Sequence, residues 1–121
     1  MASFNSTPYN YASWLEFYHN VNETLGKSFS PFRHGFLSAV GVPNSNGDKG
    51  GFVYLTGWEG GYLVPAKKEL TWTDGVFAVV KDCAGQRRVV EWRESSNIPN
   101  TAKMPTPVVW KCGFTGNNHG S

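Results

Sequence analysis

The stretch from residue 50 to residue 82, GGFVYLTGWEGGYLVPAKKELTWTDGVFAVVKD, decides the fold of this chain. It holds two apolar runs, at residues 52–55 and 76–80, and a glycine-containing turn signal precedes each of them. β-branched and aromatic residues favour strands, and Gly and Pro clusters separate strands rather than helices. We therefore predict a central antiparallel sheet built on these two runs, with a shorter run at residues 69–72 between them.

An amphipathic pattern with the period of a helix precedes this sheet. Asn10 is a suitable N-cap, Ser13 and Glu16 have capping-box spacing, and Gly26 is a suitable C-cap. The pattern predicts a helix over residues 11–20 that packs on the sheet, with an irregular aromatic arm as the alternative. The apolar positions are Tyr11, Trp14, Leu15, Tyr18, Val21 and Leu25.

The remaining segments complete a β-rich, mainly antiparallel single domain with long loops and one short N-terminal helix. Further strands are predicted at residues 36–42, 86–93 and 108–112. Loops and turns are predicted at residues 28–35, 44–50 and 94–107. The domain covers residues 11–114, between a flexible arm at 1–10 and a flexible tail at 115–121.

Composition describes a folded chain with a binding face. The 121 residues suffice for one domain, and 40% hydrophobic with 17% charged residues is typical of a globular protein. The net charge of +2 is too small to require a nucleic-acid partner by itself. Five Trp and five Tyr exceed what so small a domain hides easily, so some of these rings should lie on a contact surface.

Residues with catalytic or metal-binding chemistry are scattered. Cys83 and Cys112 are expected to be reduced thiols, and one disulfide between them is the alternative. His19, His34 and His119 lack the short spacings of a metal site, so neither a metal nor a cofactor is predicted. The carboxylates that could pair on a sheet are Glu59, Glu69, Asp74 and Glu91, but any β domain offers such pairs. We predict a protein that is not an enzyme.

Basic and aromatic residues interleave through the predicted sheet and its flanks. Lys and Arg neutralise phosphates while aromatic faces stack on unpaired bases, and this combination is typical of proteins that bind single-stranded RNA. Exposed Trp and Tyr rings stack on sugar rings as well, so a carbohydrate is an alternative partner. The predicted RNA-binding residues are Arg33, Lys49, Tyr54, Trp58, Lys67, Lys68, Arg87 and Arg88.

Short motifs at residues 12–14, 31–35, 41–46, 52–57 and 74–79 follow one another along the chain. They read Ala-Ser-Trp, Pro-Phe-Arg-His-Gly, Gly-Val-Pro-Asn-Ser-Asn, Phe-Val-Tyr-Leu-Thr-Gly and Asp-Gly-Val-Phe-Ala-Val. Their order resembles the N-terminal RNA-binding domain of coronavirus-type nucleocapsid proteins, although the long basic hairpin of that family is nearly missing. The resemblance implies an antiparallel β core in which Arg33, Tyr54 and flanking basic residues touch RNA.

We therefore expect a non-enzymatic, single-stranded RNA-binding module of viral nucleocapsid type, part of a ribonucleoprotein in the virion and the host cytoplasm. Its expected partners are the viral genomic RNA and, through self-association, a second copy, but no membrane. The alternative is a secreted β-module with a single disulfide that binds carbohydrate or protein through exposed Trp and Tyr. A structural virion domain without nucleic-acid contacts is a third hypothesis.

Overall fold

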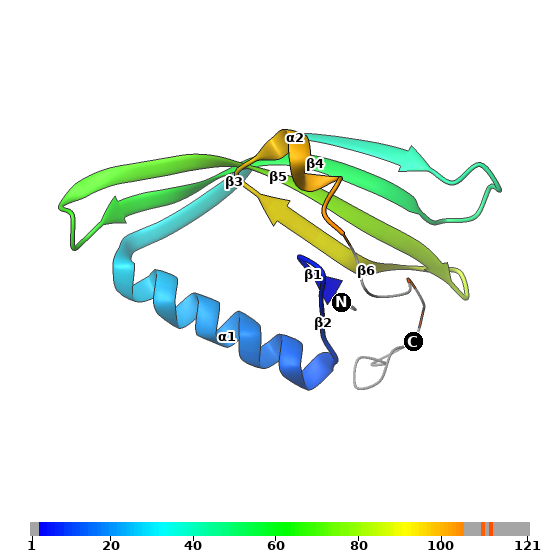
Figure 1. Ribbon diagram of the computed structural model, residues 1–121, viewed down its shortest axis with the longest axis horizontal. Helices are drawn as coiled ribbons and strands as arrows, with labels where there is room; N and C mark the ends of the chain where they lie inside the picture. The colour runs from blue at the N-terminus through cyan, green and yellow to red at the C-terminus, as the bar shows by residue number, and fades with distance from the viewer. Residues whose placement is uncertain (1–2, 106–109, 111, 113–121) are drawn as a thin grey trace.

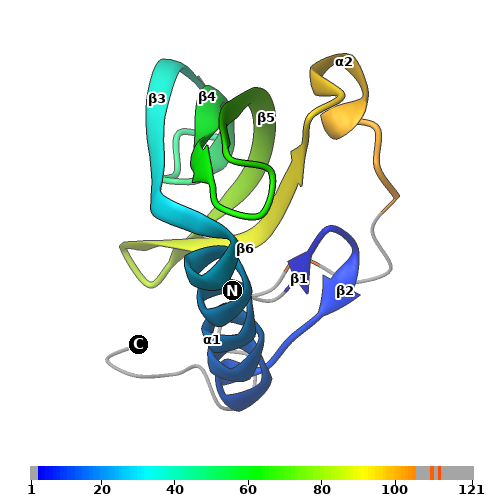
Figure 2. The same ribbon diagram turned by 90° about the vertical axis from the view of Figure 1, so that its left-hand side faces the viewer.

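A computed structural model describes residues 3–105, 110 and 112 of the chain, and it is mainly β-structure. One six-stranded mixed sheet in the order β2-β1-β6-β5-β4-β3 has helix α1 on one side and helix α2 on the other (Figures 1 and 2). This arrangement confirms the predicted β-rich fold. The elements are β1 Ser3–Phe4, β2 Thr7–Pro8, α1 Tyr11–Ser28, β3 Phe29–Pro43, β4 Gly51–Leu63, β5 Lys68–Cys83, β6 Gln86–Ser95 and α2 Ile98–Thr101.

The two apolar runs that were predicted to form the central sheet do pair with each other. Phe52 in β4 lies opposite Val79 in β5, and the antiparallel register continues without a break from Gly51 to Leu63. The turn of this hairpin lies at residues 64–67, so Gly60, Gly61 and Gly75 do not mark it, whereas Gly50 lies at the end of the predicted turn at 44–50, between β3 and β4. The run at 69–72 belongs to β5 and is not a separate strand.

Gly60 and Gly61 form a glycine cluster of the kind expected to separate strands, but both lie inside one strand. Both lie within β4 with φ angles of +143° and +151°, where a side chain would be strained. A Cβ atom on Gly60 would collide with the carbonyl oxygen of Leu70, and one on Gly61 with that of Pro31. Glycine is needed here because neighbouring strands approach closely, which is its second common role in a sheet.

The predicted loop at residues 28–35 is wrong, because residues 29–35 form the first half of β3. This strand pairs with β4 along its length, with Arg33 opposite Gly60 and Phe36 opposite Gly57. Pro31 lies in a register shift between Phe29 and Phe32, on a strand at the edge of the sheet, where a residue without an N–H group is tolerated. The predicted strand at 36–42 is confirmed as the second half of β3.

Helix α1 begins at its predicted cap but is longer than predicted. The Asn10 side chain accepts a hydrogen bond from the Ser13 amide at 2.9 Å, and the Ser13 hydroxyl accepts one from the Asn10 amide at 3.0 Å. The capping box therefore joins Asn10 to Ser13 and does not use Glu16. The prediction of a C-cap at Gly26 is wrong, since the helix continues to Ser28.

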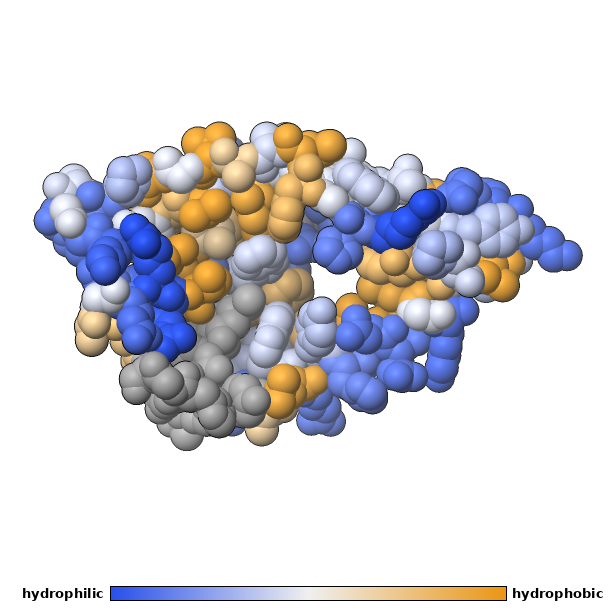
Figure 3. Space-filling model, turned by 180° about the vertical axis from the view of Figure 1, so that it is seen from behind, coloured by the Kyte–Doolittle hydropathy of each residue, from blue (hydrophilic) through white to orange (hydrophobic). Residues whose placement is uncertain are grey.

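The aromatic side of α1 packs on the N-terminal hairpin rather than on the main part of the sheet. The Trp14 ring lies 5.7 Å from Phe4 and 5.5 Å from Tyr9, and the Phe17 ring also contacts both. Leu15 is 48% exposed, so the expectation that this part of the helix packs on the sheet is wrong. Figure 3 shows open space between α1 and the sheet.

Residues 3–8, within the predicted flexible arm, form strands β1 and β2. The two strands pair with each other, and β1 also pairs in parallel with β6, with Ser3 opposite Glu91. This parallel contact makes an otherwise antiparallel sheet mixed. The Asn5 side chain strengthens it by bonding both the amide and the carbonyl of Glu94, at 2.7 and 3.0 Å.

A disulfide joins Cys83 at the end of β5 to Cys112, so the expectation of two reduced thiols is wrong. Nearby, Phe77, Val79 and Val90 form the buried core, with Phe52 and Trp110 packed against it. The predicted strand at 108–112 lies largely outside the described residues; Trp110 and Cys112 are described and neither is in a strand. The predicted tail at 115–121 lies outside them entirely.

The C-terminal half of the sheet follows the sequence prediction closely. Strand β6 confirms the predicted strand at 86–93, and α2 lies within the predicted loop at 94–107. Among the described residues, no helix has the length and apolar character needed to cross a membrane.

Candidate functional site

The sheet has two chemically different faces, named here outer and inner. The outer face is the one on which α2 and Trp110 lie: a Cβ atom on Gly75 would touch Ile98 of α2, and the Phe52 ring lies 5.9 Å from Trp110. The inner face is turned toward α1 and the N-terminal hairpin, where Phe4 contacts Trp14. Alternate residues of each strand belong to opposite faces.

Three rings of β4 form an aromatic row on the outer face: Tyr54, Trp58 and Tyr62. They share this face because each stands an even number of residues from Phe52. Tyr54 is 41% exposed and Tyr62 is 38% exposed, so both present ring surface to solvent. The side of the Tyr54 ring toward the core is fixed by Phe77, at a centroid distance of 5.2 Å.

Small neighbours leave Trp58 room on this surface. In the register it stands between Gly35 of β3 and Thr73 of β5. A Cβ atom on Gly35 would lie 2.7 Å from the indole Nε1 of Trp58, so the ring lies across the Gly35 backbone. The absence of a side chain at Gly35 therefore allows the indole to lie flat along the sheet.

Arg33 adds a positive charge beside the row. It lies opposite Gly60, between the positions of Trp58 and Tyr62, and its side chain is 57% exposed. Its guanidinium approaches the Glu69 carboxylate at 3.8 Å, and Glu69 is 63% exposed. So exposed an ion pair contributes little to stability, and the guanidinium can exchange this partner for another anion at small cost.

The other predicted basic residues lie at the two ends of the sheet. Lys67 and Lys68 lie at the β4–β5 turn. Lys49 and Arg87 meet at the opposite end, where the Arg87 Nε donates to the Lys49 carbonyl at 3.1 Å. Arg88 lies beside them and donates to the Gln86 side chain at 2.6 Å. Since β4 has 13 residues, about 40 Å separates the two ends.

The structure thus brings Tyr54, Trp58 and Arg33 together on one face and places five predicted basic residues at its ends. Tyr62 was absent from the predicted set. Its spacing in the sequence could have revealed it. Tyr62 comes four residues after Trp58 and eight after Tyr54, and residues an even number apart in a continuous strand lie on the same face.

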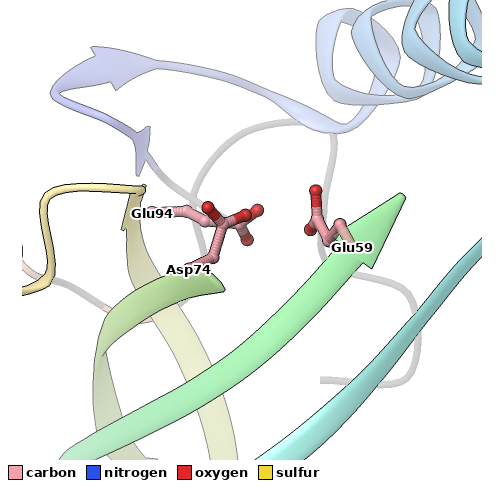
Figure 4. A group of neighbouring side chains, drawn as sticks. All are labelled: Glu59, Asp74 and Glu94. Carbon is pink, nitrogen blue, oxygen red and sulfur yellow. The ribbon is translucent and has the colours of Figure 1, made fainter. Parts of the chain in front are cut away.

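The inner face carries a cluster of three carboxylates, the acidic trio of Glu59, Asp74 and Glu94. They come from the neighbouring strands β4, β5 and β6 and turn toward one another (Figure 4). One oxygen of each lies within 4.8 Å of the others. The indole Nε1 of Trp92 donates to Glu94 at 3.0 Å and fixes that side chain. Glu94 was missing from the carboxylates considered from sequence.

Burial and mutual repulsion change the acidity of the trio. Burial, followed by the hydrogen bond and the negative charge of Glu94, raises the pKa of Glu59 to about 8. The same causes raise the pKa of Asp74 above its ordinary value. At neutral pH Glu59 therefore retains its proton, because close carboxylates cannot all ionise freely.

A hollow of about 450 Å³ adjoins the trio, bordered by the N-terminal hairpin. Its lining residues are Phe4, Asn5, Trp72, Asp74, Glu94, Ser95 and Ser96. Carboxylate oxygens are the ligands of Mg²⁺ and Ca²⁺, so the trio is the group of described residues that could hold a cation. Its negative charge makes this face unfavourable for a phosphate backbone.

Comparison with known proteins adds no family assignment to this geometry. No protein-family model, curated protein sequence or solved structure matches the chain. Function must therefore be inferred from the side chains themselves: an aromatic row with a cation on the outer face, and carboxylates on the inner one.

Proposed function

We propose that this protein is a non-enzymatic module that binds single-stranded RNA along the outer face of its sheet. One observation carries the proposal. Tyr54, Trp58 and Arg33, each selected from the sequence for its chemistry, occupy the same accessible face of two adjacent strands. Aromatic rings and a cation on one surface supply the two contacts that unpaired RNA requires, base stacking and phosphate neutralisation.

The proposed binding mode follows from the shape of the row. Bases stack on Tyr54 and Trp58, and Arg33 exchanges Glu69 for a phosphate. A strand that follows β4 reaches Lys67 at one end of the sheet and Lys49 at the other. The few cations on this path imply micromolar affinity, in the range usual for contacts that are mainly nonspecific.

The motif resemblance supports the same conclusion and extends it to a biological role. Tyr54 lies in the stretch that is similar to the aromatic strand of the nucleocapsid family, and Arg33 lies in the stretch that is similar to its arginine loop. We infer from this that the RNA is a viral genome and that the complex forms in the host cytoplasm and the virion.

The disulfide favours a second candidate, a secreted module that binds carbohydrate through the same row. Disulfides persist mainly in oxidising compartments, and Cys83 is joined to Cys112. Thr71 and Thr73, both exposed, border the row with hydroxyl groups that suit sugar hydroxyls. Both candidate ligands would bind to the aromatic row, but only RNA binding would depend on the charge of phosphate groups.

A titration with fluorescent single-stranded RNA at several salt concentrations separates the candidates. Tyr54→Ala should weaken binding by about 1–3 kcal/mol and leave the salt dependence unchanged, because stacking releases no ions. Arg33→Ala should reduce the slope of log affinity against log salt by about one. Tyr18→Ala on α1, where the ring is 55% exposed, is the matched control and should bind as the unmodified protein does.

Absence of RNA binding at low salt would refute the RNA proposal. Retention of a neutral oligosaccharide by the unmodified protein but not by Tyr54→Ala would then establish the carbohydrate candidate.

A further inference from the structure

The two edges of the sheet differ in length and in protection. One edge is β2, which has two residues and ends with Pro8. The other is β3, which has 15 residues and borders no further strand in the described part of the chain. An unpaired edge exposes N–H and C=O groups along one side of its backbone, and these can pair with another strand.

The second half of β3 lacks the charges that usually protect an edge. Residues 35–43 contain no Lys, Arg, Asp or Glu. Phe36, Leu37, Val40 and Val42 are 68%, 62%, 57% and 44% exposed. The protecting features present are a bulge between Phe36 and Ser38 and Pro43 at the strand end. From behind, hydrophobic surface lies along the top of the molecule, the side on which Figure 1 places β3, β4 and α2 (Figure 3).

We propose that the β3 edge pairs antiparallel with the β3 edge of a second copy of this chain, about a two-fold axis near Val40. Such an interface is isologous, because the same residues serve both copies. In the pairing Val42 of one copy lies near Ser38 of the other, and Val40 lies near its own counterpart. The exposed valines are thereby covered, and the backbone groups of both edges are satisfied.

Charge favours a second copy as the occupant. A net charge of +2 gives only weak repulsion between two chains. Arg33 stands seven residues before Val40, so antiparallel pairing brings it beside the turn at 44–50 of the second copy. That turn carries Asp48, whose pKa is lowered chiefly by a hydrogen bond from Asn44, and Asp48 is therefore ionised at neutral pH.

The cation of the same turn is held elsewhere, since the Lys49 Nζ donates to the Gly85 carbonyl at 2.9 Å. Arg33 of one copy thus approaches a carboxylate of the other. Residues 35–43 contain neither Lys nor Arg, so they offer no cationic side chain to the phosphates of RNA. The edge therefore suits a protein strand.

Molar mass measured without RNA across a concentration series tests the pairing. The unmodified protein should pass from monomer to dimer as concentration rises, and Val40→Lys should stay monomeric because two lysines would meet at the axis. Val64→Lys is the matched control: Val64 is 45% exposed in the β4–β5 turn, at the opposite end of β4 from Tyr54, the partner of Val40, and this variant should still dimerise. A monomer at every concentration, a dimeric Val40→Lys or growth beyond two copies would overturn the proposal.

Hydrogen exchange on the unmodified protein tests it without any substitution. Amides of residues 36–42 should exchange more slowly as concentration rises, while the Thr7 amide on the opposite edge should not change. Equal behaviour of the two edges would overturn the proposal. Because RNA is absent from both measurements, their outcome is independent of the RNA-binding proposal.

Discussion

The two faces of β4 show how one strand separates opposite chemistries. Trp58 on the outer face and Glu59 on the inner face are neighbours in sequence, yet one belongs to an aromatic row and the other to a carboxylate cluster. The alternation of side chains along a strand produces this separation. A surface for stacking and a surface that repels phosphate therefore lie back to back on the same backbone. Changes on one face should leave the chemistry of the other intact.

The largest expected effect lies in the covered part of the outer face. Arg93 donates to both oxygens of Glu91 at 3.0 Å, and the two side chains are 6% and 0% exposed. Trp110 donates to the same carboxylate. Glu91→Ala leaves a buried guanidinium uncompensated and should lower the free energy of unfolding by about 3–5 kcal/mol.

Chemical denaturation measures this change, with Arg87→Ala as the exposed control that should stay within about 0.5 kcal/mol. If Glu91→Ala also changed the free energy of unfolding by no more than about 0.5 kcal/mol, the covered part of the outer face would tolerate an unpaired charge as well as the exposed part does.

The next largest effect concerns the disulfide that attaches the C-terminal segment to the outer face. Cys83 and Cys112 are 29 residues apart, so their bond restricts a loop of the unfolded chain. Reduction should lower the free energy of unfolding by about 3 kcal/mol. Denaturation with and without reductant measures the loss, and the Cys83→Ser Cys112→Ser variant should reproduce it and show no further response to reductant.

A smaller effect separates the aromatic row from the basic ends of the sheet. If RNA extends to the end where Lys49 and Arg87 meet, Arg87→Ala combined with Arg88→Ala should reduce the salt slope of RNA binding by about two, one for each lost contact. The Tyr54→Ala loss should persist unchanged in this background. An unaltered slope would confine RNA to the row itself.

A pH dependence of stability is expected to belong to the inner face alone. The pKa of Glu59 is about 8 when folded against an ordinary value of 4.5, so the folded chain holds a proton that the unfolded chain releases between these values. Stability should therefore fall as pH rises from about 4.5 to about 8. Glu59→Gln should flatten this dependence, whereas Glu69→Gln on the exposed outer side should not.

Local patterns predicted the parts of this fold that depend on neighbouring residues. The runs at 52–55 and 76–80 contain strand-forming residues and pair as expected, and Asn10 caps α1. Tyr54 and Trp58 were selected because the chain has more Trp and Tyr rings than a small core can bury. Their spacing of four residues already placed both rings on one face of a strand. Arg33 was expected in a loop, but it lies in a strand beside them.

Features that depend on contacts between distant residues were not predictable in this way. The role of Gly60 and Gly61 follows from the approach of Leu70 and Pro31, which no local pattern reveals. The acidic trio likewise requires the register that aligns Asp74 with Gly57 and Val76 with Glu94. Without that register, Glu94 appeared to be one polar residue at the start of a loop.

The parallel contact between β1 and β6 has a consequence for the order of folding. It joins Ser3 to Glu91, across most of the chain, whereas β3, β4 and β5 each pair with the next strand in sequence. Closing a long loop costs more entropy than closing a hairpin, so the meander should assemble first and the N-terminal strands should dock last. Until they dock, β6 is a second open edge beside β3. The nascent protein should therefore be most prone to aggregate during this interval, and loss of residues 1–8 would prolong it indefinitely.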